Sequence, residues 1–593
     1  MQERELEDFY QLNSSYYLKI QERPPKSNLI DFLFYFFVLI LVVLGIKLTI
    51  FDYNFFKSIS EGNYYYNILF FPPRGNIFTS DGKVIAQNIP SFDLVIDLVL
   101  MRKDKNLFNQ TIEFLEKVEI VPNVITKEKI EEELTKKNQI LIRNIDQATG
   151  IVIKNRDLPS LIVVDSFQRF YPYGEVFSHL LGYPSFEKNL RGVSGLERTY
   201  DDYLVGEIGF KKYLRDARGI ILKEVEKKEA LEGKNLITTI DFKLQSLVFE
   251  KMKENLEKLN LKKAAALFVD DQGKILAMAS FPSFDNNIFT KVILSKEEKE
   301  KIKKILEDKN SVLLNRVISG LYAPGSIVKP VVAIAGLENK KITPQEEIYS
   351  PGYLRVQNPY TKEVFLFKDW KVHGWTNLFK AIRDSVNVYF YTLGERIGYE
   401  TLMNYYEKLD FTKLSNIDIF GEKEGILKRK EKYFLGDIYN ISIGQGEIAI
   451  TPLRMALLAQ ALGLNKILKP YLVEKIIDSN GKVVFENKPQ VIKENIFQQE
   501  ELRIVQKAMN EMATFGFGGL FKDLPLKVAG KTGTPEVGNN VFNGIFIGYF
   551  PYEKPKYFFV MLVEEAPLFS ITASRILHDI LKDGIEMGIF KDL

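Results

Sequence analysis

The sequence predicts an α+β protein with a single apolar helix near its N-terminus. The strand-like runs "LKVAGKTGT", "NGIFIGYFP" and "KYFFVMLVEE" follow one another in the last part of the chain, which is typical of an antiparallel sheet. Segments such as "ITPLRMALLAQAL" show helical periodicity. Helices that pack on an antiparallel sheet make an α+β domain. With 593 residues and 46% hydrophobic content, the chain can form more than one packed core.

The first element is an apolar run, Phe32 to Phe51, whose one charged residue, Lys47, lies near its end. This length and composition predict one membrane-spanning helix, because Lys47 can extend its amine toward the interface. A buried core helix and a cleaved signal peptide are the alternatives, and the long polar tail before the run disfavours the signal peptide. Lys19, Arg23 and Lys26 precede the run, so we expect a cytoplasmic N-terminus and the rest of the chain across the membrane.

The following segments alternate between strand-like and helix-like patterns. Residues 62–110 combine turn signals with β-branched runs, which predicts strands, and residues 107–147 show helical spacing with dense charge. A new domain is expected to begin near residue 236, with a β-hairpin over 264–280. The charged segment "SKEEKEKIKKILEDKN" predicts a solvated helix, and the chain should close with a helix near residues 573–587.

Composition excludes several classes of site. Lys and Arg number 80 against 77 Asp and Glu, so no global charge attracts the chain to nucleic acid, and we expect no nucleic-acid partner. The sequence has no cysteine, which excludes disulfides, thiolate metal sites and a cysteine nucleophile. None of the three histidines, His179, His373 and His578, lies beside a G-x-S-x-G element, so a Ser-His-Asp triad is not indicated.

The stretch "YAPGSIVKP" places Ser326 and Lys329 three residues apart. Pro330 has no amide hydrogen and crowds the carbonyl four residues before it, so its helix should begin at about Ser326. The Ser326 hydroxyl would then lie at a helix N-terminus, which favours negative charge, with Lys329 one turn later. Lys329 could activate Ser326 as a base if its pKa were lowered. The alternative is a capping serine followed by a solvent-facing lysine.

Two further motifs decide between these readings. Ser385-Val386-Asn387 lies in "RDSVNVYFY", and Lys531-Thr532-Gly533 lies in "VAGKTGT". The "GKT" of the second motif imitates a phosphate-binding loop, but Pro525 stands where that loop needs glycine. The ordered trio S-x-x-K, S-x-N and K-T-G resembles the penicilloyl serine transferases, which comprise penicillin-binding proteins and serine β-lactamases.

The sequence segments around these motifs indicate which class of the family the chain resembles. The segments "FPPRGNIFTSDGKVIAQN", "RFYPYGEVFSHLLGY" and "GVSGLERTYDDYLVGEIG" are similar to the pedestal motifs of class B penicillin-binding proteins. Within that class, "YPYG…HLLGY" and "DWK…HG" favour the penicillin-binding protein 2 branch, which is the elongation type, over the division-type branch. The resemblance implies four parts: a cytoplasmic tail (1–30), a transmembrane helix (31–51), a mixed α/β pedestal or dimerisation domain (52–235), and a transpeptidase domain with an antiparallel sheet flanked by helices (236–593).

The resemblance also assigns roles to the catalytic motif residues. It implies that Ser326 is the acyl-accepting nucleophile and Lys329 its general base. Ser385 and Asn387 would complete the proton relay and hold the substrate amide. Lys531 would add positive field near Lys329 and so help to keep that amine neutral.

Substrate binding is implied for Thr532, Gly533 and Thr534, with the two threonines on the terminal carboxylate of a D-Ala-D-Ala stem peptide. The oxyanion hole would consist of the backbone amides of Ser326 and Thr534. Some relatives bind a metal near the "DWK…HG" element, but Asp369 and His373 alone are too few ligands here. We therefore expect no metal and no cofactor, and a structural role for His373.

The function implied is a penicillin-sensitive peptidoglycan D,D-transpeptidase of cell-wall elongation, anchored in the inner membrane with its catalytic domain periplasmic or extracellular. The interval between anchor and transpeptidase is too short for a glycosyltransferase module, so the implied partner is a SEDS-family glycosyltransferase of the rod-shape type that contacts the anchor and pedestal. Peptidoglycan stem peptides and β-lactams are the implied ligands. The alternatives are a division-type transpeptidase, a hydrolase (D,D-carboxypeptidase or β-lactamase), and a β-lactam sensor or dormant scaffold.

Overall fold

The computed structural model describes residues 28–51, 65–185, 191–216, 220–357, 362–516, 519–538 and 540–590. The predicted cytoplasmic tail lies outside these residues apart from its last three, and so do the three basic residues used for orientation. The chain forms two compact units. One comprises Met1–Ile68 and Lys211–Lys227, and the other comprises Leu69–Phe210 and Lys228–Leu593.

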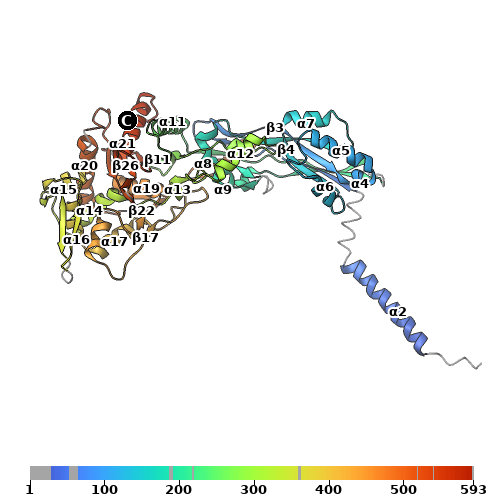
Figure 1. Ribbon diagram of the computed structural model, residues 1–593, viewed down its shortest axis with the longest axis horizontal. Coiled ribbons are helices and arrows are strands. Elements are labelled where there is room, and N and C mark those ends of the chain that lie inside the picture. Colours follow the sequence, from blue (N-terminus) through green and yellow to red (C-terminus); the bar gives the residue numbers. More distant parts are fainter. Residues whose placement is uncertain are drawn as a thin grey trace, which may run out of the picture. The chain divides into compact units, whose positions relative to one another are not determined.

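The first unit contains the apolar N-terminal helix. Helix α2 spans Asn28–Ile46 and continues as a π-helical turn, η1, over Lys47–Phe51 (Figure 1). Residues Phe32–Ile50 have a mean hydropathy of 2.6, and none of this window is buried within the protein. A buried core helix is therefore excluded, and the helix is long and apolar enough to cross a membrane. A three-stranded sheet, in the order β1-β8-β9, also lies largely in this unit: Tyr65–Phe70, Gly209–Arg215 and Ile221–Lys228.

The N-terminal part of the second unit is built on a seven-stranded sheet with the order β21-β20-β10-β2-β3-β4, with β5 paired to β3. Its strands are β2 (Ile77–Phe78), β3 (Val84–Asp97), β4 (Gln139–Ile145), β5 (Leu161–Phe170), β10 (Asn235–Thr238), β20 (Val473–Ile477) and β21 (Val483–Glu486). Its helices are α4 (Leu98–Lys103), α5 (Lys105–Lys117), α6 (Lys127–Glu133), α7 (Gln147–Lys154), α8 (Ser178–Leu181), α9 (Gly195–Thr199) and α10 (Asp201–Leu204). Strands from residues 473–486 thus join a sheet that begins near residue 77.

Two local predictions in this region hold only in part. Strands were expected over 62–110 and form up to Asp97, whose carboxylate accepts hydrogen bonds from the amides of Val99 and Leu100 and starts α4. Helices were expected over 107–147 and form as α5 and α6, but residues 139–145 form β4, which pairs antiparallel with β3. Three of the four apolar residues of "QILIRNI" are isoleucine, a β-branched residue that favours a strand once a partner strand lies beside it.

The C-terminal part is the predicted α+β domain. A five-stranded sheet has the order β12-β11-β27-β26-β23, with every pair antiparallel. Its strands are β11 (Ala264–Asp270), β12 (Ile275–Phe281), β23 (Ala529–Gly533), β26 (Gly544–Phe550) and β27 (Tyr557–Val563). Alternate residues of β11 enter two different cores: Leu267 packs with α19 (Pro452–Leu464), and Phe268 packs with α11 (Phe242–Lys258) and α21 (Ser570–Glu586). Both faces of the sheet are therefore covered by helices, which explains the continuous apolar strand sequences.

Most of the remaining helices gather on the α19 side of this sheet. They are α13 (Arg316–Ser319), η5 (Gly325–Val328), α14 (Lys329–Glu338), α15 (Leu378–Arg383), α16 (Asn387–Ile397), α17 (Tyr399–Lys408), α18 (Leu435–Ser442) and α20 (Gln499–Phe515). Helix α12 (Lys296–Leu306) contacts the N-terminal part instead, where the Lys299 amine donates to the Asn123 side chain. Helix α12 has no buried residue and begins at a Ser295–Glu298 capping box, so the predicted solvated helix is confirmed. Helix α14 is buried on all sides from Lys329 to Leu337, which makes it the centre of this helical layer.

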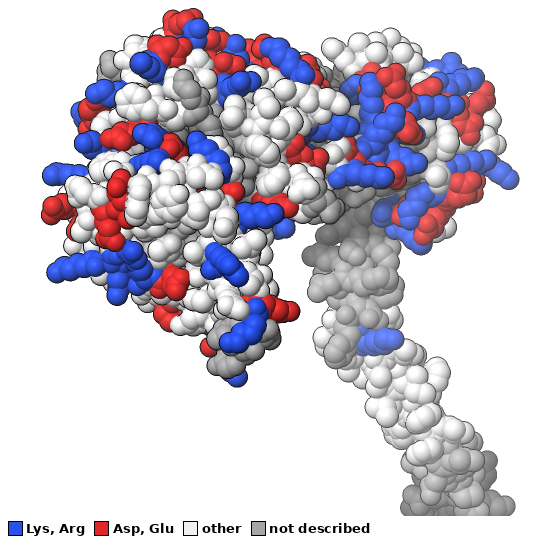
Figure 2. Space-filling view, turned by 60° about the vertical axis from the view of Figure 1, so that its left-hand side comes forward, with Lys and Arg blue, Asp and Glu red and all other residues white. Residues whose placement is uncertain are grey.

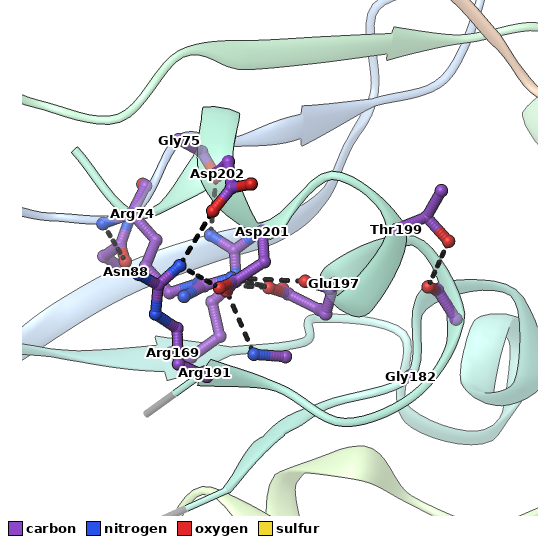
Figure 3. Close-up of polar contacts among 12 residues, drawn as sticks. Arg74, Gly75, Asn88, Arg169, Gly182, Arg191, Glu197, Thr199, Asp201 and Asp202 are labelled. Atoms are coloured by element: carbon purple, nitrogen blue, oxygen red, sulfur yellow. Dashed lines mark hydrogen bonds and ion pairs between the residues drawn. The ribbon is translucent and has the colours of Figure 1, made fainter. Parts of the chain in front are cut away.

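A buried ion network joins the N-terminal motifs of the second unit (Figure 3). The Arg74 guanidinium lies 2.9 Å from the Glu197 carboxylate and 2.8 Å from that of Asp201, and Arg169 lies 2.5 Å from Glu197. Burial alone would raise the pKa of Glu197, but Arg169 and Arg74 hold that pKa below its ordinary value. The Glu197 carboxylate is therefore held in its charged form by the two guanidinium groups that face it, as a buried ion cluster requires.

The residues that follow Glu197 connect this network to the C-terminal part. The Tyr200 hydroxyl donates to Asp418 over 2.7 Å, and the Phe420 amide donates to the Thr199 hydroxyl over 2.8 Å. The Arg198 guanidinium lies 3.3 Å from the centre of the Phe420 ring. Three consecutive side chains thus fix one loop of the catalytic part. On the face seen in Figure 2, basic and acidic side chains are intermixed, in keeping with the balanced composition.

Candidate active site

Ser326 lies on the helical turn that leads into α14. The turn η5 spans Gly325–Val328 as a 3₁₀-helix, and the α-helix follows from Lys329 with Pro330 in its first turn. The helical segment therefore begins within one residue of the predicted start, because the missing amide of Pro330 costs nothing in a first turn. The Ser326 side chain is half-buried and forms no hydrogen bond with the part of the chain that the structure describes.

Glycines allow three segments to meet at this turn. The Gly325 amide donates to Gly444 O over 2.8 Å, and a Cβ at Gly444 would lie 2.2 Å from Gly325 O. A Cβ at Gly533 would lie 2.8 Å from Pro324 O, so strand β23 approaches the same turn. Side chains at these positions would push the segments apart. The glycine of K-T-G is thus explained by close backbone contact with the turn that carries Ser326.

Lys329 is fully buried, so the alternative of a solvent-facing lysine is wrong. Its Nζ donates to Ser385 O and Asn387 Oδ1, each over 2.7 Å, and lies 3.3 Å from Ser385 Oγ. Burial lowers the pKa of Lys329 to about 7, and the Asp369 carboxylate opposes this by raising the pKa. A substantial fraction of the amine is therefore unprotonated near neutral pH, as a general base requires.

Ser385 and Asn387 come from the junction between α15 and α16. Ser385 has a φ of 55°, a left-handed conformation that is uncommon for a residue other than glycine. The Val386 side chain is buried in the core, whereas Ser385 Oγ and Asn387 Oδ1 face Lys329. The strained backbone at Ser385 therefore presents both polar side chains to one amine.

Lys531 reaches the same serine from strand β23. It is fully buried, and its Nζ donates to Ser385 Oγ over 2.9 Å and to Thr532 O over 3.0 Å. Burial, and then the charge of Lys329, lower the pKa of Lys531 well below its ordinary value. Burial is the first cause of the lowered pKa of both lysines, and because their repulsion is mutual, a charge on Lys531 also disfavours a proton on Lys329.

The structure brings Lys329, Ser385, Asn387 and Lys531 into one hydrogen-bonded cluster and sets Ser326 on the adjoining turn. Of the implied substrate residues, Thr532 is buried on β23, the edge strand of the sheet, and Thr534 is half-buried and follows directly after that strand. No hydrogen bond to the described residues occupies the Thr534 hydroxyl.

Asp369 is a site residue that sequence reasoning considered only as a metal ligand. Its carboxylate accepts a hydrogen bond from the Val388 amide over 2.9 Å and so caps the catalytic end of α16. The His373 Nε2 atom lies 3.5 Å from Asp369, and burial lowers the pKa of His373. Within the described ranges, no three His, Asp or Glu side chains are grouped as a metal site would need. The signal for Asp369 was its place in "KDWKVHG", just before the S-x-N motif.

Two family models match this chain. The model of the penicillin-binding protein transpeptidase domain matches residues 264–583, and that of the penicillin-binding protein dimerisation domain matches residues 70–238. The first match contains the turn that carries Ser326 and all four residues of the hydrogen-bonded cluster.

Relatives match over most of their length. The peptidoglycan D,D-transpeptidase MrdA of Haemophilus influenzae is 31% identical, over 88% of this chain and 85% of that protein. The protein of the same name from Acinetobacter baumannii is 27% identical, over 86% and 80%. Among solved structures, the complex between PBP2 and MreC from Helicobacter pylori is similar with a TM-score of 0.73 at 26% identity, over 89% of this chain and 100% of that chain.

Proposed function

This chain belongs to the class B penicillin-binding proteins of the PBP2 type, and we propose that Ser326, Lys329, Ser385, Asn387 and Lys531 form its acyl-transfer centre. The protein is a penicillin-sensitive peptidoglycan D,D-transpeptidase of the elongation type. The single observation that supports the proposed centre is Lys329: a fully buried amine, with a pKa of about 7, that contacts the S-x-N motif one turn after a serine hydroxyl.

The proposed reaction has two acyl transfers. Lys329 takes the proton of Ser326, and Ser326 Oγ attacks the carbonyl carbon of the penultimate D-alanine of a stem peptide. The peptide C–N bond breaks, and D-alanine leaves after receiving a proton through Lys329, Ser385 and Lys531. An amine of a neighbouring stem then attacks the Ser326 ester, which forms the crosslink and returns the proton to the serine. A β-lactam would acylate Ser326 in the same first step.

The edge strand supplies the proposed substrate groups. Thr532, Gly533 and Thr534 bind the terminal carboxylate of the stem, and the amides of Ser326 and Thr534 stabilise the oxyanion. The support is the contact between Gly533 and the turn that carries Ser326, because it sets the strand backbone beside the nucleophile.

Acylation by a fluorescent penicillin tests these assignments. Ser326→Ala should abolish covalent labelling with an unchanged melting temperature, while Ser295→Ala, at an exposed helix cap, should label like the parent. Lys329→Ala should retain reversible penicillin binding and lose acylation. Undiminished labelling of Ser326→Ala would exclude this serine as the nucleophile.

We also propose a domain organisation and a membrane orientation like those of the class B penicillin-binding proteins. The divisions are a cytoplasmic tail (1–30), a membrane helix (31–51), a pedestal (52–235) and a transpeptidase domain (236–593). The helix would cross the inner membrane and hold the catalytic domain on the periplasmic or extracellular side; its length and apolar surface support this. Cysteine substitution at Lys57 or Lys19, followed by a membrane-impermeant thiol reagent on intact cells, tests the orientation: Lys57→Cys should react and Lys19→Cys should not.

The proposed partner is a SEDS-family glycosyltransferase of the rod-shape type that contacts the anchor and pedestal. The matched family models cover a dimerisation and a transpeptidase domain, so glycan polymerisation would come from a separate protein. A MreC-like partner is proposed as well, since the Helicobacter pylori PBP2 was solved in complex with MreC. Affinity purification of the full chain from membranes should recover such a polymerase, and recovery without any SEDS protein would count against the partnership.

A further inference from the structure

An exposed aromatic surface lies beside the catalytic cluster and has no part in the acyl-transfer scheme. It comprises Tyr349, Tyr353, Trp370 and Trp375, which we call the aromatic platform; these side chains are 52%, 46%, 61% and 62% exposed. The sequence has only two tryptophans, and both are in the platform. Large aromatic side chains bury much apolar area when they find a partner, so a group this exposed marks a binding surface.

Backbone pairings bring the four platform residues onto neighbouring segments. Strand β13 (Ile348–Ser350) pairs with β16 (Gly374–Thr376) so that Tyr349 lies opposite Trp375, with ring centres 5.3 Å apart. The Asp369 amide, next to Trp370, donates to Gly352 O over 2.8 Å, next to Tyr353. The two backbone pairings thus bring both tryptophans and both tyrosines onto neighbouring strands and turns.

The Trp370 ring and the Trp375 backbone are held in place although both side chains are exposed. The Trp370 Nε1–H donates to Asp384 O over 3.1 Å, and the Lys371 amine lies 4.4 Å from the Trp370 ring centre. The Lys380 amine donates to Trp375 O over 2.9 Å and fixes that backbone. Rings that are already ordered lose little conformational freedom when they bind, which favours recognition.

The platform adjoins the catalytic residues directly. Asp384, which accepts from Trp370, precedes Ser385 in the chain. Lys368 O, two residues before Trp370, lies 3.5 Å from Asn387 Nδ2. A stem peptide of about five residues spans at most about 17 Å, so a stem that occupies the catalytic cluster carries its own sugar strand close to this surface.

We propose that the aromatic platform binds the glycan strand of peptidoglycan, by stacking of its rings on the CH faces of the amino sugars. This inference rests on the proposed function, because the substrate stem is attached to such a strand. Hexopyranose rings with equatorial substituents present apolar CH faces, which match the faces of tryptophan and tyrosine. Neutral N-acetylated sugars need no charged partner, and the exposed groups of the platform are aromatic rings. The platform positions the strand, while the Ser326 cluster performs the chemistry.

Intrinsic fluorescence gives a direct test, because the whole tryptophan emission of the protein comes from Trp370 and Trp375. We expect stem-free glycan strands, prepared from peptidoglycan with an amidase, to change the emission of the full-length protein in a saturable way, and to do so at high salt as well, because the carboxylates that the amidase exposes take no part in ring stacking. Free stem peptides should leave it unchanged at the same concentration. No change with glycan strands, or a change with stem peptides alone, would overturn the proposal.

Variants locate the effect. Trp375→Ala should weaken glycan binding about threefold to tenfold, since one aromatic contact contributes about 0.5–1.5 kcal/mol, and Trp375→Tyr should restore most of it. The matched control is Phe485→Ala, an exposed aromatic on β21, which should bind like the parent. Glycan binding that is unaffected by Trp375→Ala would also overturn the proposal.

Penicillin acylation distinguishes a failure of the proposed acyl-transfer centre from a failure of the proposed glycan-binding platform. Trp375→Ala should react with fluorescent penicillin at the parent rate, because this small ligand needs only the Ser326 cluster, yet its crosslinking of polymeric substrate should fall. Absent penicillin labelling in the parent would refute the acyl-transfer centre and leave the glycan titration interpretable. Parent-level crosslinking by Trp375→Ala would refute the platform and leave the acyl-transfer centre standing.

Discussion

The rate constant of penicillin acylation should follow the protonation of Lys329. In the proposed mechanism the neutral amine is the base, and burial lowers its pKa to about 7. Acylation should therefore fall as pH decreases, by about 100-fold between pH values of about 8 and about 5, because only about 1% of the amine is neutral two units below its pKa. Above about pH 8 the rate should reach a plateau.

The midpoint of this pH profile should lie at the pKa of Lys329, and a substitution of Asp369 tests what sets that pKa. The Asp369 carboxylate raises the pKa of Lys329 against the larger effect of burial. Asp369→Asn removes the charge but keeps an oxygen that can accept from the Val388 amide, so the midpoint should move to lower pH with little loss of stability. Asp523→Asn, at an exposed carboxylate far along the chain, should leave the midpoint unchanged.

The assay is stopped-flow measurement of second-order acylation rates with a fluorescent penicillin across this pH range. Melting temperatures measured at each pH ensure that only folded protein is compared. A flat profile, or a midpoint near the ordinary lysine value of 10.5, would refute the reasoning that burial creates the base.

Three further changes are predicted. Lys329→Met should abolish acylation yet raise the free energy of unfolding at neutral pH by about 1–4 kcal/mol, because it relieves the burial of an ionisable amine; chemical denaturation measures this, and a less stable variant would contradict it. Gly533→Ala should slow acylation, because its Cβ would lie 2.8 Å from Pro324 O, and an unchanged rate would show that this contact is dispensable. Glu197→Gln should destabilise the protein by about 3–5 kcal/mol. Since Arg169 and Arg74 lower the pKa of Glu197 below its ordinary 4.5, its stabilisation persists above that value and is lost as pH falls through the lower folded pKa; Glu113→Gln, on an exposed helix pair, is the control.

The sequence predicted features that depend on local chemistry. Pro330 limits where its helix can begin, so the start of the helical turn that carries Ser326 could be predicted to within one residue. Asp241 accepts from the Leu244 amide as the cap of α11, and Asp is one of the residues preferred at that position. The apolar strands β26 and β27 were recognisable because their side chains are buried on both faces.

Features that depend on distant segments were not predictable. Strand β4 was read as part of a helix because its partner, β3, lies some distance along the chain. The environment of Lys329 depends on Ser385 and Asn387, which come from another helix, so no local pattern could distinguish a buried base from a solvent-facing lysine. The three motifs together identified the site in the sequence. The burial of Lys329 and the capping role of Asp369 could be recognised only from the packed structure.

The covalent intermediate provides the most direct test of the account. The full-length protein would be mixed with a D-Ala-D-Ala stem peptide, quenched rapidly in acid, and digested for tandem mass spectrometry. We predict one acyl adduct, on Ser326, with D-alanine released in equal amount and no adduct in Lys329→Ala. An adduct on any other residue, or an unchanged adduct yield in Lys329→Ala, would contradict the central claim that Lys329 activates Ser326.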